Sequence, residues 1–394
     1  MRYNNRGYRP APRSSLPAGR HGFTNKSVYI DVSKFVNKST SDQEVETFVP
    51  THSFIDFKFQ GILNKNIVDK GYTTLTPIQD QAIPHIIVGK DIVGIANTGT
   101  GKTAAYLLPI INKIILDSRE KVLIVVPTRE LANQIDEELR AFAKNSNLFS
   151  VLCIGGIGIG KQIRELRYRH HFVIGTPGRL KDLMEQKVLD LSGFKTVVLD
   201  EADRMLDMGF IHDMRFMLSQ TPKERQTLFF SATLSPEIEK LIHEFLREPI
   251  RISVKTRDTA KNIHQDVIRI PRDKNKVDVL HNLLNQEEYS KVLVFGRTKH
   301  GVEKLAHELE KRGIKAESIH GNKSQPQRQR ALDLFKRDLA QVLTATDVAA
   351  RGLDISSVTH VINFDLPATY DDYVHRIGRT GRGDKLGKAL TFIQ

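Results

Sequence analysis

Residues 91–103, DIVGIANTGTGKT, join a predicted strand to a predicted helix through a glycine-rich turn. Four of the five residues from 92 to 96 are apolar, as expected of a buried strand. Threonine and glycine alternate in the turn, and apolar residues then recur at helical spacing from 104 to 108. The order strand, loop, helix predicts an α/β fold with this turn at the carboxyl end of a strand.

The turn has the composition of a phosphate-binding loop. Its glycines let backbone N–H groups converge on phosphate oxygens, and the start of the following helix adds a partial positive charge. Lys102 can neutralise the outer phosphates, and the Thr103 hydroxyl can bind Mg²⁺. Ala96 stands where the general pattern has its first glycine, so the match needs partners elsewhere in the chain. The residues expected at the phosphates are Thr98, Gly99, Thr100, Gly101, Lys102 and Thr103.

The composition is that of an ordinary soluble protein with an excess of basic residues. The chain has 394 residues, enough for two or three domains, with 40% hydrophobic and 27% charged residues. A net charge of +13 favours a polyanionic partner such as nucleic acid, although solubility alone would also explain it. The single cysteine excludes an internal disulfide and suits a reducing compartment, which we expect to be the cytoplasm. No apolar stretch reaches membrane-spanning length, so we expect no membrane partner.

Residues 1–50 are expected to form a basic, disordered tail. Five arginines occur in the first 20 residues, and no acidic residue precedes Asp31. Glycine, proline and serine interrupt any periodicity, so the segment cannot bury enough apolar surface to offset its chain entropy. Interleaved arginine and tyrosine suit RNA contacts, and an inert solvated tail fits equally well. Organellar import is a lesser alternative.

Short apolar strands alternate with helical patterns along the rest of the chain. Residues 51–253 and 263–394 show this alternation, and the polar, aperiodic residues 254–262 are expected to link them. The alternation predicts two domains, each with a mostly parallel sheet covered by helices on both faces. Polar clusters follow the strands at their carboxyl ends, where open α/β sheets bind ligands. We therefore expect the chemistry in a cleft between the domains.

Asp200 and Glu201 follow the apolar run TVVL, residues 196–199. A carboxylate at this position can hold Mg²⁺ through water, and the next one can activate an attacking water. The start of a helix favours acidic residues as well, so the pair alone decides nothing. Together with the phosphate loop it favours a nucleoside triphosphatase. Ser231 and Thr233 end another strand, where they suit a helix N-cap as well as a functional role.

The stretch HRIGRTGR, residues 375–382, places three arginines at intervals of three residues. We expect Arg376, Arg379 and Arg382 to share one helical face. A run of charge is usually a solvated face. Here it also suits arginine fingers that reach across a cleft to a γ-phosphate.

These motifs together resemble those of the DEAD-box ATP-dependent RNA helicases of superfamily 2, from Phe54 to the end of the chain. Residues 200–203 read DEAD, and Ala96 begins the phosphate loop in the form that this family uses. The resemblance implies two tandem RecA-like domains with ATP and RNA sites at the cleft between them. The other matching stretches, in the family's order, are GYTTLTPIQ (71–79), PTRELA (127–132), Gly155-Gly156, TPGR (176–179), VFGRTK (294–299), Gln325 with Arg328, and ATDVAARGLD (345–354).

The resemblance also implies roles for single residues at an ATP and Mg²⁺ site. Gln79 would hydrogen-bond the adenine edge, Phe54 would stack on the base, and Asp347 would contact the ribose. Mg²⁺ would lie near Thr103 and Asp200, partly through water. The residues implied in catalysis are Lys102, Asp200, Glu201, His375, Arg379 and Arg382, and those implied in coupling the domains are Asp203, Ser231 and Thr233.

RNA contacts follow from the resemblance in the same way. The residues involved offer threonine and arginine side chains and glycine backbone, which suit phosphates and 2′-hydroxyls rather than base edges. Binding to single strands and short duplexes would therefore be independent of sequence. The implied RNA contacts are Pro127, Thr128, Arg129, Gly155, Gly156, Thr176, Pro177, Arg179, Arg297, Gln325, Arg328 and Thr346.

Two features depart from the family pattern. Asn97 and Thr100 stand where glutamine and serine are commoner in the loop, which are mild changes. The chain stops at Gln394, at the end of a predicted strand, where family members usually continue with a helix. We expect either a fragment or a second domain with an exposed flank.

The predicted function is RNA-stimulated ATP hydrolysis that drives local, non-processive unwinding of short RNA duplexes or remodelling of RNA–protein complexes. ATP would favour a closed cleft that bends one RNA strand, and hydrolysis would reopen the cleft. An ATP-dependent RNA clamp or scaffold would carry the same motifs. A DNA translocase of the same superfamily is a weaker alternative, because DEAD and GYTTLTPIQ argue against it.

Overall fold

A computed structural model shows two parallel sheets in the chain. It describes residues 35–36, 48–97, 99–254, 263–350, 355, 357–381 and 386–393. Most of the predicted tail and most of the predicted linker lie outside these residues. The boundaries 1–50, 51–253, 254–262 and 263–394 therefore stay predictions.

Within the described residues, the first sheet has seven parallel strands in the order β3-β4-β2-β5-β6-β1-β7. The strands are β1 (Ile92–Ile95), β2 (Val122–Val125), β3 (Ser150–Cys153), β4 (Phe172–Gly175), β5 (Thr196–Leu199), β6 (Gln226–Ser231) and β7 (Ile250–Ser253). The helices are α1 (Gly61–Asp69), α2 (Pro77–Ile87), α3 (Lys102–Leu116), α4 (Arg129–Phe142), α5 (Ile159–Leu166), α6 (Pro177–Glu185), α7 (Ala202–Asp207), α8 (Ile211–Ser219) and α9 (Pro236–Phe245).

The second sheet has six parallel strands among the described residues, in the order β10-β11-β9-β12-β13-β8. The strands are β8 (Ile263–Arg269), β9 (Val292–Phe295), β10 (Ala316–Ile319), β11 (Val342–Ala345), β12 (His360–Asn363) and β13 (Gly387–Ile393). The helices are α10 (Lys276–Leu284), α11 (Lys299–Lys311), α12 (Gln325–Lys336), α13 (Asp347–Ala350) and α14 (Tyr370–Ile377).

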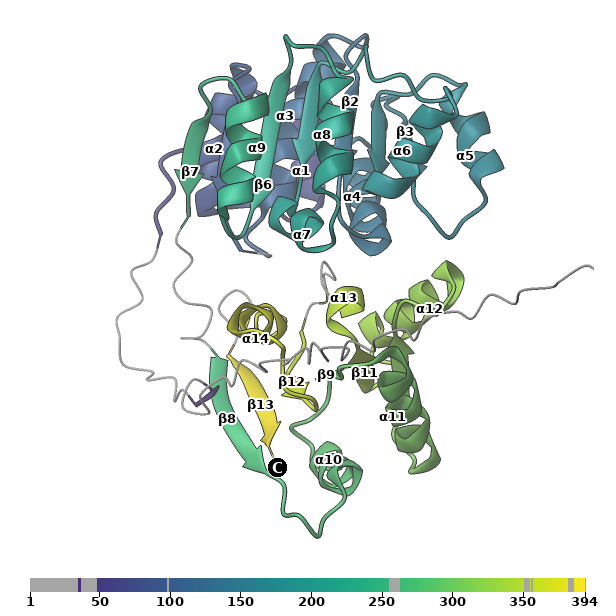
Figure 1. The fold of residues 1–394 in the computed structure, drawn as a ribbon. Helices are drawn as coiled ribbons and strands as arrows, with labels where there is room; N and C mark the ends of the chain where they lie inside the picture. The colour runs from purple at the N-terminus through teal and green to yellow at the C-terminus, as the bar shows by residue number, and fades with distance from the viewer. Residues whose placement is uncertain are drawn as a thin grey trace, which may run out of the picture.

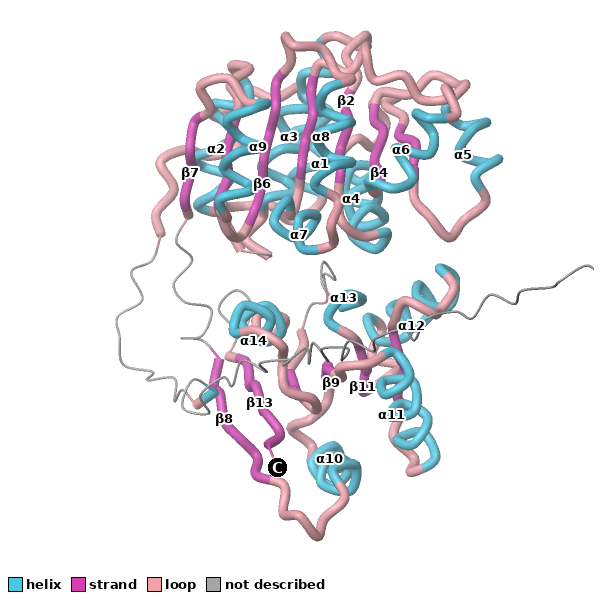
Figure 2. The backbone as a smooth tube through the Cα atoms, viewed as in Figure 1, coloured by secondary structure: helices cyan, strands magenta, loops and turns pink. Residues whose placement is uncertain are grey.

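Helices cover both faces of each sheet, as Figure 1 shows. In the first domain, α1 to α4 pack on one face and α5 to α9 on the other, each with its own cluster of buried apolar side chains. The short strands are almost wholly buried because parallel sheets of this kind are covered on both sides. The tube in Figure 2 shows the loops that follow the strands, with α7 of the first domain towards α13 and α14 of the second.

The predicted fold class of two parallel-sheet α/β domains is confirmed. β7 was not predicted from the sequence. β13 lies between β12 and β8 and is buried except at Lys388 and Ile393, so the structure shows no exposed flank at this described strand. In the described part of the chain, no helix has the length and hydropathy needed to cross a membrane.

Candidate ATP and RNA site

The phosphate-loop motif adopts the predicted strand–loop–helix arrangement. Gly99 and Gly101 have left-handed backbone conformations, with φ of 85° and 89°, and α3 begins at Lys102. The Lys102 side chain is only 6% exposed, and its Nζ donates a 2.8 Å hydrogen bond to the carbonyl of Ala96. The amine is thus held inside the curve of its own loop. Thr98, predicted at the phosphates, lies outside the described residues.

Gln79 connects the predicted adenine site to this loop. Its Oε1 accepts from the Thr76 N–H at 3.0 Å in a capping box at the start of α2, and its Nε2 donates to the Gly101 carbonyl at 3.1 Å. These two bonds fix which side of the amide is oxygen and which is nitrogen. Phe54, the predicted stacking residue, is buried and meets Tyr72 edge-on at 6.2 Å.

Asp200 lies directly after β5, at the carboxyl end of the sheet. Its Oδ1 accepts from the Glu201 N–H at 2.9 Å, and its Oδ2 accepts from the Tyr106 hydroxyl at 3.1 Å. Burial raises the pKa of Asp200 to about 6, although the nearby Lys102 amine opposes the rise. Tyr106, which the motifs did not single out, also has the Thr103 hydroxyl beside it, so one phenol joins both residues predicted to bind Mg²⁺.

Glu201 adopts a conformation that is uncommon for a residue with a side chain. Its φ of 52° and ψ of 51° place it in the left-handed region, where it precedes α7 as the N-cap. Such backbone strain costs on the order of 1–3 kcal/mol and tends to occur at functional sites. The turn directs the chain sharply away from β5, and the carboxylate pairs with Arg204 at 3.4 Å.

The predicted coupling residues Asp203, Ser231 and Thr233 form one hydrogen-bonded cluster. Asp203 Oδ2 accepts from the N–H of Ala232 at 3.0 Å, and from the N–H and hydroxyl of Thr233 at 2.8 and 3.0 Å. The Ser231 hydroxyl accepts from the Asp203 N–H at 3.2 Å. The end of β6 is therefore fastened to the start of α7, so a movement of either segment is transmitted to the other.

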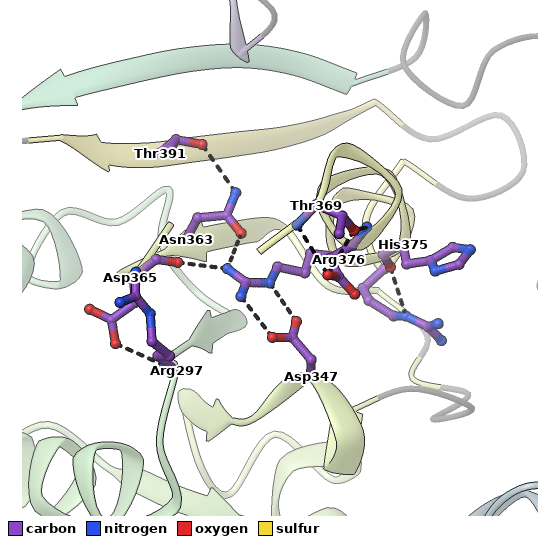
Figure 3. A network of polar contacts seen from close by, with 10 residues as sticks. Arg297, Asp347, Asn363, Asp365, Thr369, His375, Arg376 and Thr391 are labelled. Atoms are coloured by element: carbon purple, nitrogen blue, oxygen red, sulfur yellow. Dashed lines mark hydrogen bonds and ion pairs between the residues drawn. The ribbon is translucent and has the colours of Figure 1, made fainter. Parts of the chain in front are cut away.

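The prediction that three arginines share one helical face is wrong for the two described ones. α14 ends at Ile377, and Gly378 closes it by donating from its N–H to the Val374 carbonyl, so Arg379 lies beyond the helix. Arg376 is buried within the second domain, where Nε and Nη2 donate to the Asp347 carboxylate at 2.6 and 2.8 Å (Figure 3). Arg382 lies outside the described residues.

Arg376 also makes contacts with residues at the carboxyl edge of the second sheet. Its Nη1 donates to Asn363 Oδ1 at 3.1 Å and to the Asp365 carbonyl at 2.7 Å, and its guanidinium lies 5.1 Å from the Phe295 ring centroid. Asp347, predicted at the ATP ribose, uses both carboxylate oxygens in this pair. In Figure 3 the His375 ring points away from the Arg376–Asp347 pair, although His375 and Arg376 are neighbours in α14.

A hollow between the domains brings residues of both together. Arg204 Nη2 donates across the domain boundary to the Val348 carbonyl at 3.1 Å, and Arg379 Nε donates to the His375 carbonyl at 3.3 Å. The side chains around the hollow come from the phosphate loop, from the DEAD segment, from the end of β6, and from α14 and the turn after it. They are Lys102, Glu201, Asp203, Arg204, Asp207, Ala232, His375 and Arg379.

Predicted RNA contacts of the first domain follow β2, β4 and β3, which are neighbours in the sheet. Thr128 caps α4 by accepting from the Leu131 N–H at 3.3 Å. Arg129 fits beside Gly155 and Gly156, where a Cβ on the first glycine would come within 2.9 Å of its guanidinium. Burial lowers the pKa of Arg129, and the neighbouring Arg328 adds to the effect.

The other predicted RNA contacts of this domain lie at the end of β4. Thr176 is the N-cap of α6, Pro177 is its first residue, and Arg179 donates to the Ile157 carbonyl at 3.3 Å.

Two predicted RNA contacts of the second domain instead meet a residue of the first. Arg328 Nη2 donates to Glu130 Oε2 at 2.8 Å, and Gln325 Nε2 lies 3.4 Å from Glu130 Oε1. All three side chains are buried, so this is a contact across the domain boundary. The motif PTRELA predicted no role for Glu130, although its position beside Arg129, a predicted RNA contact, was a signal in the sequence.

The remaining predicted RNA contacts of the second domain lie at the carboxyl ends of its strands. Arg297, after β9, has an exposed side chain and donates from its N–H to Asp365 Oδ2 at 2.8 Å. Thr346 follows β11, where its carbonyl accepts from the N–H groups of Ala349 and Ala350.

Comparison with family sequence models finds two matches. Residues 76–241 match the DEAD/DEAH box helicase model, and residues 275–384 match the helicase conserved C-terminal domain. The chain is 46% identical over 345 residues to the DEAD-box ATP-dependent RNA helicase CshA of Bacillus licheniformis, across 87% of this chain and 71% of that protein. The chain belongs to the DEAD-box helicase family. CshA of Bacillus subtilis gives a similar result, at 46% identity over 87% and 70% of the two chains.

Solved structures of DEAD-box proteins resemble this one as well. Dbp5 of S. cerevisiae bound to RNA and ADP BeF3 gives a TM-score of 0.76 at 29% identity, across 87% of this chain and 89% of that one. Mss116p bound to ssRNA and AMP-PNP gives 0.77 at 29% identity, across 91% and 76%. A DEAD box protein from Methanococcus jannaschii is 37% identical across 88% and 94%, with a TM-score of 0.52.

Proposed function

We propose that this DEAD-box ATP-dependent RNA helicase hydrolyses ATP in the hollow between its domains and couples the reaction to local separation of short RNA duplexes. The observation that carries the proposal is the lining of that hollow. It places the Lys102 amine and the Glu201 carboxylate of the first domain opposite His375 and Arg379 of the second. Closure around a triphosphate would therefore complete a site that neither domain holds alone.

Selectivity for adenine follows from the fixed amide of Gln79. Among the described residues, its oxygen and its nitrogen each make one bond to the protein, which leaves a second lone pair on the oxygen and a second hydrogen on the nitrogen. A free acceptor beside a free donor complements the N6 and N7 positions of adenine, whereas guanine presents two acceptors there. A site built in this way should discriminate strongly against GTP.

The donor set at the end of β5 fits Mg²⁺. Magnesium is usually held by one or two carboxylates together with phosphate oxygens and water, rather than by a dedicated protein cage. Within the described residues there is no group of three or more histidine, cysteine, aspartate or glutamate side chains that could hold a metal alone. We assign Asp200 and the Thr103 hydroxyl to it. When bound, the ion would neutralise charge on the phosphates.

The remaining groups of the hollow divide the chemistry. Glu201, turned out of β5 by its left-handed backbone, would orient and deprotonate the attacking water. Lys102 would leave the Ala96 carbonyl to contact the outer phosphates. Arg379, and Arg382 by its place in the motif, would stabilise charge on the transferring phosphoryl group.

RNA would lie over the segments that follow β2, β4 and β3 at the carboxyl edge of the first sheet. These segments are next to the ones that we assign to ATP. Arg129 and Arg179 supply positive charge there, and Gly155 and Gly156 leave room for the Arg129 guanidinium beside them. The domain arrangement supports this assignment. It is similar to that of Dbp5 and Mss116p bound to RNA and nucleotide, and two contacts cross the domain boundary, from Arg204 to Val348 and from Arg328 to Glu130. We infer that the structure represents the closed arrangement.

The test compares ATP turnover with strand separation. We expect turnover to rise with single-stranded RNA and little with DNA of the same sequence, and GTP to be a poor substrate. A duplex of about ten base pairs should separate in the presence of RNA-stimulated turnover. Equal stimulation by DNA would favour a translocase, and turnover with stable RNA retention but no strand separation would favour a clamp.

A further inference from the structure

Phe35, which belongs to the sequence segment predicted to be a tail, is one of the most deeply buried residues in the protein. Its side chain is 1% exposed, whereas that of the next residue, Val36, is 47% exposed. Figure 1 shows this short purple segment beside β8, at the second domain. A residue that precedes the first domain in the sequence therefore packs against the second domain.

In the part of the chain that the structure describes, the apolar residues that pack around Phe35 belong to the second domain. They are Ile263 of β8, Ala389 of β13, and Tyr373 and Ile377 of α14, with Val267 at the margin. The Phe35 and Tyr373 rings meet edge to face, with centroids 4.7 Å apart and planes at 63°. This geometry is favourable for aromatic pairs, and a buried phenylalanine removes about 150–250 Å² from water. The cluster is separate from the two larger cores of that domain.

The helix that receives Phe35 is also the helix that carries the second domain's part of the site. Tyr373 and Ile377 lie four residues apart and therefore on one face of α14. Between them, Arg376 leaves the helix on another side to bind Asp347, and His375 lines the hollow between the domains. A side chain that fills the space behind α14 limits how far the helix can tilt away from the hollow.

Tyr373 links this packing to the sheet. Its hydroxyl donates a 2.9 Å hydrogen bond to Gln265 of β8, and both side chains are buried. The tyrosine ring thus has Phe35 against it and a fixed partner at its hydroxyl. Removing Phe35 would leave the ring with a cavity on one side, and α14 would gain freedom to move.

We propose that Phe35 is a positioning residue, which packs on the second domain and holds α14 in the orientation that the hollow requires. Docking itself is independent of the function proposed above, while its effect on turnover rests on that function. The two claims therefore need separate readouts.

Docking can be measured by fluorescence because the chain contains no tryptophan. In the full chain, Phe35→Trp should give emission at shorter wavelength, with several-fold less quenching by acrylamide than Val36→Trp. If the two variants emit and quench alike, residue 35 is not docked and the proposal is overturned.

Positioning can be measured by amide hydrogen exchange without any activity. Phe35→Ala should speed exchange in α14 roughly tenfold, because local opening becomes easier, and leave α11 of the same domain unchanged. Val36→Ala is the matched control, and Phe35→Leu should restore most of the protection by refilling the site. Equal acceleration of α11 and α14 would make Phe35 a general stabiliser and overturn the positioning role.

The effect on turnover completes the test. Phe35→Ala should lower RNA-stimulated kcat roughly 10- to 100-fold, since small displacements of catalytic groups are costly, with nucleotide affinity within about twofold. Unchanged kcat in Phe35→Ala would overturn the positioning role even if residue 35 is docked. A wild-type protein without RNA-stimulated turnover would instead contradict the proposed function, and the emission and exchange measurements would still decide the role of Phe35.

Discussion

The carboxyl edges of the two sheets contribute to the hollow in different ways. On the first sheet, the predicted functional residues that follow strands lie in the loop after the strand or in the first turn of the next helix. Those after β1, β5 and β6 belong to the predicted ATP half, and those after β2, β3 and β4 to the predicted RNA half. On the second sheet, two arginines that make central contacts come from helices, Arg328 from α12 and Arg376 from α14. A residue that directly follows a strand is held at the carboxyl edge of the sheet. A helical residue can face the hollow, its own domain or the partner domain.

The largest expected effect belongs to a strand-end residue of the first domain. Glu201→Gln keeps the size and hydrogen bonding of the side chain but removes the general base, so turnover should fall about 10³- to 10⁴-fold. ATP affinity should stay within a few-fold, because Lys102 and Gln79 are untouched. Steady-state turnover and titration calorimetry measure the two quantities. The exposed Glu185 offers a control in Glu185→Gln. Normal hydrolysis by Glu201→Gln would remove this residue from the chemistry.

The second prediction concerns a helical arginine that faces its own domain. Arg376→Ala leaves Asp347 without its partner. Breaking a fully buried ion pair typically costs about 3–5 kcal/mol of unfolding free energy, and the cost should be lower here because the Asp347 side chain is 24% exposed. Denaturant unfolding of the full chain should show this loss in the second domain. Arg376→Lys should recover only part of it, because an ammonium cannot form the paired hydrogen bonds of the guanidinium. A stable Arg376→Ala protein with impaired turnover alone would place Arg376 with Arg379 as a residue of the hollow.

The third prediction concerns a helical arginine that faces the other domain. A double-mutant cycle of Glu130→Gln and Arg328→Ala should give a coupling free energy of about 1–2 kcal/mol in RNA binding with a bound ATP analogue. Without nucleotide the coupling should disappear, since the contact requires closure. Coupling of the same size in both conditions would mean that the contact does not report closure.

The smallest expected effect tests the second domain away from the hollow. His360 is stacked on Tyr289 at 4.1 Å, and burial, followed by the Lys388 charge, lowers its pKa from 6.5 to about 4. Between these values the unfolded chain binds a proton that the folded chain does not, so stability falls as pH drops from about 6.5 towards 4. His360→Gln should remove about 1 kcal/mol of this loss between pH 7 and 5, allowing for solvent screening.

Unfolding at both pH values checks this last effect. His300 of the same domain is exposed, so His300→Gln serves as the control for replacing a histidine. If both variants keep the wild-type pH dependence, His360 is not the group responsible.

The strand-end residues were predictable from the sequence because an apolar run followed by a polar motif marks the end of a parallel strand. Lys102, Asp200 and Asp203 lie where this reasoning placed them. The positions of Arg376 and Arg379 were not predictable in the same way, since periodicity alone could not show that α14 ends at Ile377. Tyr106 was missed because a tyrosine within an apolar helix resembles a core residue, and its hydroxyl partner Asp200 is distant in sequence. Whether Thr98 and Arg382 take their predicted roles stays a prediction.

Phe35 and Ala389 also have a consequence for how the protein is made. The ribosome makes Phe35 354 residues before Ala389 of β13, which forms one wall of its pocket. At about 5–20 residues per second, tens of seconds separate the two. During that time the pocket of Phe35 is incomplete, because Ile263 of β8 and Tyr373 of α14 are made before Ala389. Its burial therefore marks a molecule whose synthesis has reached β13 and whose second domain has folded.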